Sequence, residues 1–324
     1  MRLANWREAL AAEASNLFYD LPSLTPWTAE WFDCALTLSR YRRVFGSYPN
    51  LRQPKTFSEK VIHKRLYDRR PLLRTVADKV AVRDYVASIV GADYLPALHA
   101  LATDPEAIDW GALPARFVVK CSHGSGYNLV VTDKAAFDVD AAKATVRAWL
   151  RSSFYRYTRE WCYRDLPRRV FVEEFLEGPG GTVPDDWKFF VYGGRAVYVQ
   201  VDRGRFTDHR HSFYRRDRTP IDVRYLCDNL AEPPAFPANL EAMFDLAERL
   251  GRDFDFVRVD LYNVGGRIVF GELTNYPNAG LMPFEPASVD LEFGSHWQLP
   301  SRRQTAQRGA RRERSAADRK STAT

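Results

Sequence analysis

The sequence of 324 residues is poor in cysteine, with four in total, and none of them is close to another. Cys34, Cys121, Cys162 and Cys227 form no C-x-x-C pair, and no histidine stands at metal-ligand spacing from them. This arrangement indicates neither a zinc site nor a disulfide framework. A reducing cytoplasm is the compartment that fits it best.

Long apolar runs are also missing. No stretch approaches the roughly 20 uncharged residues that a membrane-spanning helix needs. Arg7, Glu8 and Glu13 interrupt the apolar residues at the N-terminal end, so no export signal is predicted. We expect a cytoplasmic protein without a transmembrane segment, and we leave peripheral contact with the inner face of the membrane open.

Outside its C-terminal end the sequence has no excess of either charge. Of 47 basic and 41 acidic residues, residues 301–324 contribute eight basic and two acidic ones, which is the whole net charge of +6. The same end has no large apolar residue, so it cannot offset the entropy cost of ordering its backbone. We therefore predict a disordered basic tail at residues 301–324 and expect no nucleic-acid partner. Binding of the tail to an anionic polymer or lipid, and a tail that is merely solvated, both stay open.

Helical spacing dominates the first third of the chain. Apolar residues recur every three or four positions in residues 1–50, which we interpret as an N-terminal helical arm. The same periodicity in residues 56–91 predicts two helices joined near Arg70 and Pro71. These helices belong to a helical region over residues 51–115.

Strand patterns dominate the following part. Short β-branched runs on either side of residues 123–126 predict a strand, a glycine loop and a second strand. Gly193-Gly194 and Gly265-Gly266 each lie between alternating apolar runs and predict two β-hairpins. An amphipathic helix that ends at Gly251 lies between the hairpins. The order predicts an α+β or mixed α/β fold with substantial antiparallel sheet.

The glycine loop Gly124-Ser125-Gly126 is the first candidate for chemistry. It follows Lys120, and glycines let backbone N–H groups approach phosphate oxygens while the lysine supplies a mobile positive charge. The loop is neither a P-loop nor a G-x-G-x-x-G motif. An ordinary hairpin turn is the alternative interpretation.

A second candidate combines Arg258 and Asp260 on one strand with Glu272 on the returning strand. Strand alternation puts Arg258 and Asp260 on one face, and the return can bring Glu272 beside Asp260. Two neighbouring carboxylates repel unless a cation lies between them, and oxygen ligands with bound phosphates suit Mg²⁺. Arg258 would then face a transferring phosphoryl group. The alternative is that Asp260 only pairs with Arg258 or Arg267 on the sheet surface.

Other basic residues stand out by their context. Lys188 lies in an otherwise aromatic strand, where a side chain that points to solvent is the commoner outcome. The arginines of residues 203–216 suit recognition of carboxylate or phosphate, since guanidinium forks match planar anions. A solvated basic loop is equally plausible there. From this stretch we predict an acceptor site at Arg203, Arg205 and Arg210.

Seven blocks follow one another along the chain: PKTFSEKVIHKRLYDRRP, ADKVAVRDYV, FVVKCSHGSGYN, VFVEEFLEG, DDWKFFVYGG, FVRVDLY and FGELTNYPNAG. Together they resemble the TupA-like branch of the ATP-grasp superfamily, from about Leu51 to Leu299. The resemblance implies an ATP-grasp fold, with the nucleotide between two lobes. The flap lobe would be residues 116–178 and the metal-binding lobe residues 179–300.

The resemblance also implies roles for individual residues. Two lysines and the flexible flap would bind the ATP phosphates: Lys79, Lys120, His123, Gly124, Ser125 and Gly126. An interlobe hinge would read the adenine or ribose: Glu173, Glu174, Phe175 and Leu176. Arg258 and Lys188 would be catalytic, while Asp260 and Glu272 would hold Mg²⁺. The family's further metal position is Thr274 here, so Asn275 would serve as a ligand only if a bulge redirects it.

The function implied is an ATP-dependent carboxylate–amine ligase that uses ATP and Mg²⁺ and acts through an acyl phosphate. The resemblance points to an acidic cell-surface polysaccharide, a uronic acid or a precursor as the acceptor. One alternative is a kinase that stops at phosphoryl transfer. Another is a non-enzymatic binder of anionic polymers that works through the basic tail. The sequence predicts no oligomeric state.

Overall fold

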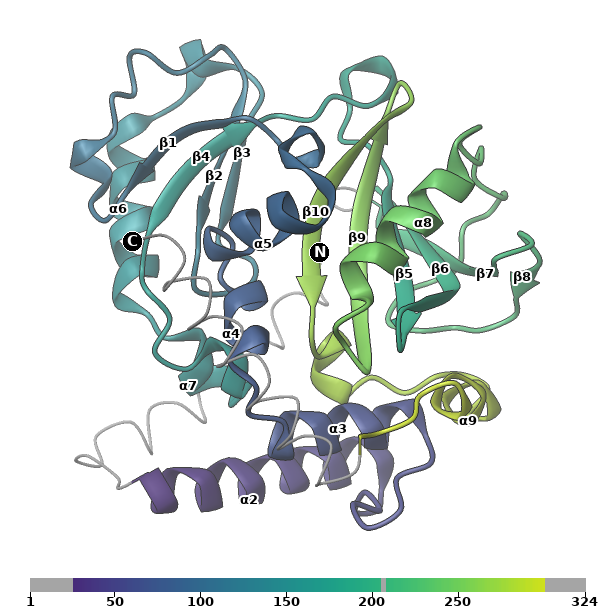
Figure 1. Cartoon of the computed structure of the whole chain (residues 1–324). Coiled ribbons are helices and arrows are strands. Elements are labelled where there is room, and N and C mark those ends of the chain that lie inside the picture. Colours follow the sequence, from purple (N-terminus) through teal and green to yellow (C-terminus); the bar gives the residue numbers. More distant parts are fainter. Residues whose placement is uncertain (1–25, 205–207, 301–324) are drawn as a thin grey trace, which may run out of the picture.

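Two antiparallel β-sheets divide the molecule into two lobes (Figure 1). The computed structural model describes residues 26–204 and 208–300. Residues 1–25 of the predicted arm, Arg205 and the predicted basic tail at residues 301–324 lie outside these ranges. The predicted combination of helices with antiparallel sheet is confirmed.

The first lobe is a four-stranded sheet in the order β1-β4-β2-β3, in which all neighbours are antiparallel. Its strands are β1 Leu98–Ala102, β2 Phe117–Cys121, β3 Asn128–Val131 and β4 Val170–Glu174. Along β2, Phe117 and Val119 pack into a core that includes helix α6, Val139–Arg151. Strand alternation therefore leaves Val118 and Lys120 on the opposite face, which α6 does not cover.

Strand β1 differs from the prediction of a helical region over residues 51–115. It pairs with β4 at the edge of the sheet, with Leu101 opposite Phe171. Leu98 and Leu101 are both exposed, so the strand lacks the alternation of buried apolar residues by which a half-buried strand is recognised. The sheet of the flap lobe therefore takes in a strand from before residue 116.

The second lobe is a six-stranded antiparallel sheet in the order β10-β9-β5-β6-β7-β8. Its strands are β5 Asp186–Tyr192, β6 Arg195–Arg203, β7 Arg210–Arg215, β8 Pro220–Ile221, β9 Phe256–Val264 and β10 Arg267–Thr274. The hairpins predicted at Gly193-Gly194 and Gly265-Gly266 are confirmed. All four glycines have positive φ, between 56° and 92°, which glycine adopts without a steric penalty.

Helices cover one face of this sheet and one end of the other face, and every residue of the central strand β5 is buried. Helix α8, Leu240–Gly251, packs on one face, where the rings of Phe189 and Phe244 meet edge to face at 4.9 Å. The other face meets helix α3 (Phe57–Tyr67) and helix α9 (Ser288–Ser295) at one end only. The rest of that face holds polar side chains and borders the space between the lobes.

The predicted pair of helices in residues 56–91 is three helices: α3, α4 (Pro71–Ala77) and α5 (Ala81–Val90). Asp78 causes the additional break, because its Oδ1 accepts hydrogen bonds from the backbone N–H groups of Val80 and Ala81 at 2.9 and 3.2 Å. An aspartate that bonds its own following backbone competes with helix continuation. The break exposes Lys79 at the junction between α4 and α5.

Helix α2 (Pro26–Phe45) and the short α7 (Phe154–Thr158) complete the α-helices of the described ranges. Short 3₁₀ turns occupy Ala92–Tyr94, Pro105–Ala107, Lys134–Ala136, Trp161–Tyr163, Pro179–Gly181 and Pro277–Gly280. All four cysteines lie in the described ranges and are unpaired, as predicted. Within those ranges, we find no helix with the length and apolarity that crossing a bilayer requires.

Glu160 should make the stability of the fold depend on pH. It is buried beside Arg65, and burial raises its pKa from 4.5 to about 7 despite that positive charge. Between these values the unfolded chain releases a proton that the folded protein retains, so stability should fall as pH rises through this window. The free energy of unfolding should fall by about 3 kcal/mol less in Glu160→Gln than in wild type, because each pKa unit corresponds to ~1.36 kcal/mol. Denaturant unfolding of both proteins from pH 4 to 8 measures this difference. Free energies of unfolding that change equally with pH in the two proteins would contradict the prediction.

Candidate active site

A cleft of about 790 Å³ opens between the two lobes. Lys120 and Glu173 line it from the first sheet, Asp260 and Glu272 line it from the second, and Lys79 lines it from the α4–α5 junction. Figure 1 shows α4 and α5 between the two sheets, where they close one side. Small-molecule sites typically have volumes of about 300–1,000 Å³. The cleft therefore has the size for a nucleotide, and it gathers residues predicted from distant parts of the sequence.

Strand alternation determines which side chains of the first sheet point into the cleft. Val118 and Lys120 on β2, and Phe171 and Glu173 on β4, line the cleft from the face that α6 leaves uncovered. The Lys120 ammonium donates a hydrogen bond to Glu173 Oε1. A lysine and a glutamate thus stand together on the wall, one able to attract phosphate and the other able to accept from a sugar hydroxyl or an amino group.

The glycine loop is the turn between β2 and β3, and only part of it reaches the cleft. Ser125 and Gly126 line the cleft, and Gly126 has φ of +80°. A Cβ atom on Gly124 would lie 2.6 Å from the ring of Tyr127, so glycine is required there. His123 is buried away from the cleft, and its Nε2 lies 3.0 Å from the Trp149 carbonyl. The structure therefore brings Ser125 and Gly126 to the site and gives His123 a packing position against α6.

Lys79 connects the helical junction to this loop. Its ammonium donates to the Gly124 carbonyl at 2.6 Å, and its backbone N–H donates to the Ser122 carbonyl at 3.1 Å. Since Lys79 and Lys120 both line the cleft beside the loop, the two predicted phosphate-binding lysines share one region of the site.

The predicted hinge follows β4 along the edge of the cleft. Glu174, Phe175 and Leu176 all line it. Glu174 bridges the lobes, because its carboxylate accepts from Arg267 on β10 at 2.7 and 3.1 Å. Its partners hold the pKa of Glu174 below its usual value, chiefly through the Arg267 hydrogen bond. Phe175 and Leu176 supply apolar surface at the same edge, as a planar base would require.

The second wall carries the predicted carboxylates. Glu272 lies directly opposite Asp260 in the β9–β10 ladder, as predicted, after a bulge at Gly271. Arg258 donates to Asp260 through Nε at 2.7 Å and through NH2 at 2.6 Å, and the same NH2 lies 3.1 Å from Glu272 Oε1. Asp260 thus does pair with Arg258, and of the two only Asp260 lines the cleft, while Arg267 pairs with Glu174.

The electrostatics of this group favour a cation. Burial raises the pKa of Asp260 to about 7, and the Glu272 charge adds to that effect while Arg258 opposes it. A divalent cation between the two carboxylates would attract both of them and so offset their mutual repulsion. The donor set of two carboxylates on neighbouring strands therefore fits Mg²⁺, which prefers oxygen ligands.

Asn275 does not join these carboxylates. It is buried and absent from the cleft lining, and its amide nitrogen donates to the Leu73 carbonyl at 2.9 Å. The bulge precedes Glu272 and leaves the later part of β10 in regular alternation, so Asn275 points away from the face of Glu272. Thr274 occupies the family position and accepts from Arg258 at 3.0 Å.

Lys188, predicted to be catalytic, is buried and does not line the cleft, and its burial also excludes the alternative of a solvent-facing side chain. Its ammonium donates to Asp202 Oδ2 on the neighbouring strand β6 and lies 3.8 Å from Asp186. In the ladder Lys188 lies opposite Asp260. Asp186 and Asp202 both line the cleft and were not among the predicted residues. Polar residues at alternate positions of an apolar strand, Gln200 and Asp202, were the signal that could have identified this part of the wall.

Of the three arginines predicted for the acceptor site, Arg203 alone is found at the cleft. Its guanidinium pairs with Asp185, with NH2 2.8 Å from Oδ2. Arg210 pairs instead with the exposed Asp208 at 2.8 Å and does not line the cleft. Arg205 lies outside the described residues.

Replacing Lys120 with alanine should weaken ATP binding about ten- to hundredfold, since hydrogen bonds to charged groups contribute about 1.5–3 kcal/mol. Lys143→Ala is the matched control, because Lys143 pairs with Glu106 on the far side of the same lobe. Isothermal titration with a non-hydrolysable ATP analogue measures both variants. Equal affinity in wild type and Lys120→Ala would remove Lys120 from the nucleotide site.

The two antiparallel lobes and the cleft between them form an ATP-grasp fold. The chain belongs to the TupA-like ATP-grasp family, whose model matches residues 59–298. The predicted ATP-grasp fold and family are thereby confirmed. No curated protein matches the sequence.

Solved structures of ATP-grasp ligases are similar at low sequence identity. A D-alanine–D-alanine ligase from Bacillus anthracis shares 13% identity at a TM-score of 0.41, over 74% of this chain and 70% of that one. The corresponding enzyme from Helicobacter pylori shares 14% at a TM-score of 0.39, over 69% and 61%. The ligase PsnB, complexed with minimal precursor, Mg and ADP, shares 12% at a TM-score of 0.35, over 69% and 60%. Of the Bacillus anthracis enzyme bound to ATP, this chain covers 54%.

Proposed function

We propose that this protein is an ATP-dependent ligase that joins a carboxylate to an amine through an acyl phosphate, with an acidic cell-surface polysaccharide or its precursor as the acceptor. One observation carries the proposal. Lys79 and Lys120 line the same cleft as the carboxylates of Asp260 and Glu272, and Arg258 contacts both of these carboxylates. Positive side chains for phosphates and oxygen ligands for Mg²⁺ are the two requirements of phosphoryl transfer.

The first half of the reaction would use both walls. Lys79, Lys120 and the backbone of Ser125 and Gly126 would hold the ATP phosphates. An acceptor carboxylate oxygen attacks the γ-phosphorus, the bond from that phosphorus to the bridging oxygen breaks, and ADP leaves. Arg258 would stabilise the charge that develops on the transferring group. Mg²⁺, when bound by Asp260 and Glu272, supplies charge neutralisation for the phosphates.

The second half needs an amine. Its nitrogen attacks the acyl carbon, phosphate leaves, and the nitrogen gives up a proton as the amide forms. The lobes would exclude water, which would otherwise hydrolyse the acyl phosphate. The acidic polysaccharide is proposed from the resemblance to the TupA-like branch, and Arg203 at the cleft is a guanidinium with which a uronic acid could pair.

Release of ADP from ATP and Mg²⁺, measured across a panel of uronic acids and amino acids, tests the function. Release that needs both an acid and an amine, with hydroxylamine trapping the acyl phosphate as a hydroxamate, is the expected result. Release with an acid or sugar alone, and a stable phosphorylated product, would identify a kinase. If the protein neither releases ADP nor binds ATP, both the ligase and the kinase are refuted. Binding to an anionic polymer that is lost when residues 301–324 are removed would then favour the polymer binder.

A further inference from the structure

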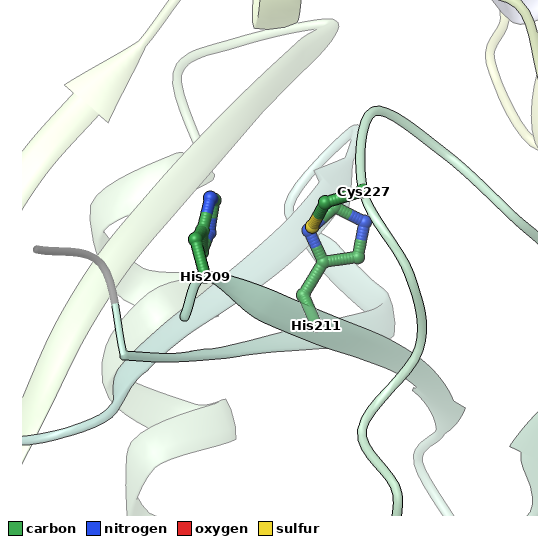
Figure 2. A group of neighbouring side chains, drawn as sticks. All are labelled: His209, His211 and Cys227. Atoms are coloured by element: carbon green, nitrogen blue, oxygen red, sulfur yellow. The ribbon is translucent and has the colours of Figure 1, made fainter. Parts of the chain in front are cut away.

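A second group of metal-ligating side chains lies beside the β6–β7 end of the larger sheet (Figure 2). His209 precedes β7, His211 lies on β7, and Cys227 lies on the loop after β8. One ligand atom from each of the three lies within 4.8 Å of the others. Figure 2 shows the Cys227 sulfur next to a ring nitrogen of His211, and the distance from Sγ to Nδ1 is 3.3 Å.

The backbone holds these residues together. His211 donates its N–H to the Asp228 carbonyl at 3.2 Å, which ties β7 to the loop that carries Cys227. In the same loop Cys227 donates its N–H to the Tyr225 carbonyl at 2.8 Å. The closeness of His211 to Cys227 is therefore set by main-chain bonds and does not depend on the placement of one side chain.

Asp202 lies next to both imidazoles. Its Oδ2 lies 3.0 Å from His209 Nε2, and its Oδ1 lies 3.8 Å from His211 Nδ1. Lys188 and Gln200 also donate to this carboxylate, so it is fixed in place. Proteins usually orient a ligating imidazole with a carboxylate on the ring nitrogen that does not bind the metal, and Asp202 can do this for His209 through Nε2.

The group is suited to a metal ion and unsuited to nucleophilic catalysis. The thiol and Asp202 face the same nitrogen of His211, whereas a catalytic triad uses the two ring nitrogens separately.

We propose that His209, His211 and Cys227 bind one Zn²⁺ ion, with Asp202 as the carboxylate that orients the His209 imidazole. Imidazole nitrogen and thiolate sulfur are preferred zinc ligands, while Mg²⁺ prefers oxygen. Zinc bonds of about 2.0–2.1 Å to nitrogen and 2.3 Å to sulfur place tetrahedral N and S ligands about 3.5 Å apart, close to the 3.3 Å between His211 and Cys227. The His209 side chain is 29% exposed and can rotate to complete the site.

The site with zinc bound would carry one net positive charge. The Cys227 thiolate, formed as the metal displaces the thiol proton, and the Asp202 carboxylate offset the two positive charges of zinc. The Lys188 ammonium stays on Asp202 Oδ2 and adds one further positive charge. Because Asp202 and Arg203 both line the cleft, the ion would fix the wall that the acceptor is proposed to meet.

Zinc binding is measured on the untagged full-length protein without ATP. The result therefore does not depend on whether the protein catalyses the proposed ligase reaction. After treatment with a chelator, wild type should take up about one Zn²⁺ per chain. Replacement by Co²⁺ should produce the near-ultraviolet charge-transfer absorption of a cobalt–thiolate bond. Cys227→Ser should abolish that absorption, and both Cys227→Ser and His209→Ala should weaken zinc binding at least about tenfold.

Two variants serve as matched controls: Cys34→Ser on α2 and His99→Ala on β1, which remove a cysteine and a histidine elsewhere. Both should bind zinc as wild type does. Circular dichroism in chelator checks that all four variants fold. The proposal is overturned if wild type takes up no zinc, or if folded Cys227→Ser and His209→Ala bind it as tightly as wild type.

Discussion

Mg²⁺-dependent ADP release should fall at least about a hundredfold when Glu272 is replaced with glutamine. Glu272 lies opposite Asp260 in the ladder, and its Oε1 is 3.1 Å from Arg258 NH2. The change removes one of the two negative charges proposed to hold Mg²⁺ and keeps the size of the side chain. Because that side chain is 36% exposed, the fold should tolerate the substitution.

Glu241→Gln is the control for this loss. Glu241 is an exposed carboxylate on α8 that pairs with Arg216 away from the cleft, and its removal should leave turnover unchanged. Thermal melting shows whether Glu272→Gln has the stability of wild type. A Glu272→Gln protein with full turnover would remove Glu272 from the metal site.

Asp255→Ala should destabilise the fold by about 3–5 kcal/mol, the effect expected when one partner of a buried ion pair is removed. Asp255 Oδ1 accepts from Lys64 at 3.0 Å and from Arg70 at 2.8 Å, and its Oδ2 accepts from the Trp297 indole N–H at 2.8 Å. The change would leave the fully buried Lys64 and the nearly buried Arg70 without this carboxylate.

Denaturant unfolding measures this loss against two comparisons. Glu106→Ala breaks exposed pairs with Lys143 and Arg147 and should cost less than about 1 kcal/mol. Asp255→Asn keeps the shape of the side chain and one oxygen, but it replaces the other oxygen with an NH₂ group and removes the charge. Its loss of stability should therefore lie between those of the other two variants. Equal stability of Asp255→Ala and wild type would mean that these buried cations do not depend on Asp255.

Local patterns predicted much of the fold because the structure uses them directly. The glycine pairs at 193–194 and 265–266 need positive φ in a two-residue turn, so composition and position pointed to the same hairpins. Alternation on β9 and the return of β10 were enough to bring Glu272 beside Asp260. Lys120 was predictable because the strand and the glycine loop that place it are adjacent in sequence.

Features that depend on distant partners were not predictable in this way. Lys188 is buried because Asp202 on the next strand receives it, and no pattern within β5 reveals that partner. His123 was assigned to the site because it adjoins the glycine loop, but it packs on the α6 side of the sheet, where the Trp149 carbonyl lies 3.0 Å from its Nε2. The meeting of His211 with Cys227 depends on a loop that passes β7 after β8, so spacing along the chain gave no sign of it.

The path of the chain through the two lobes has a consequence for biosynthesis. The first sheet and its core draw on residues between 98 and 174, whereas the core of the second lobe joins Phe57 on α3 with residues as late as Trp297. Contacts between nearby residues form sooner than contacts that must close long loops. During synthesis the flap lobe can therefore fold on its own, while α3 waits until Trp297 has left the ribosome. Until then, the aromatic surface of the larger lobe is the part of the nascent chain most open to aggregation.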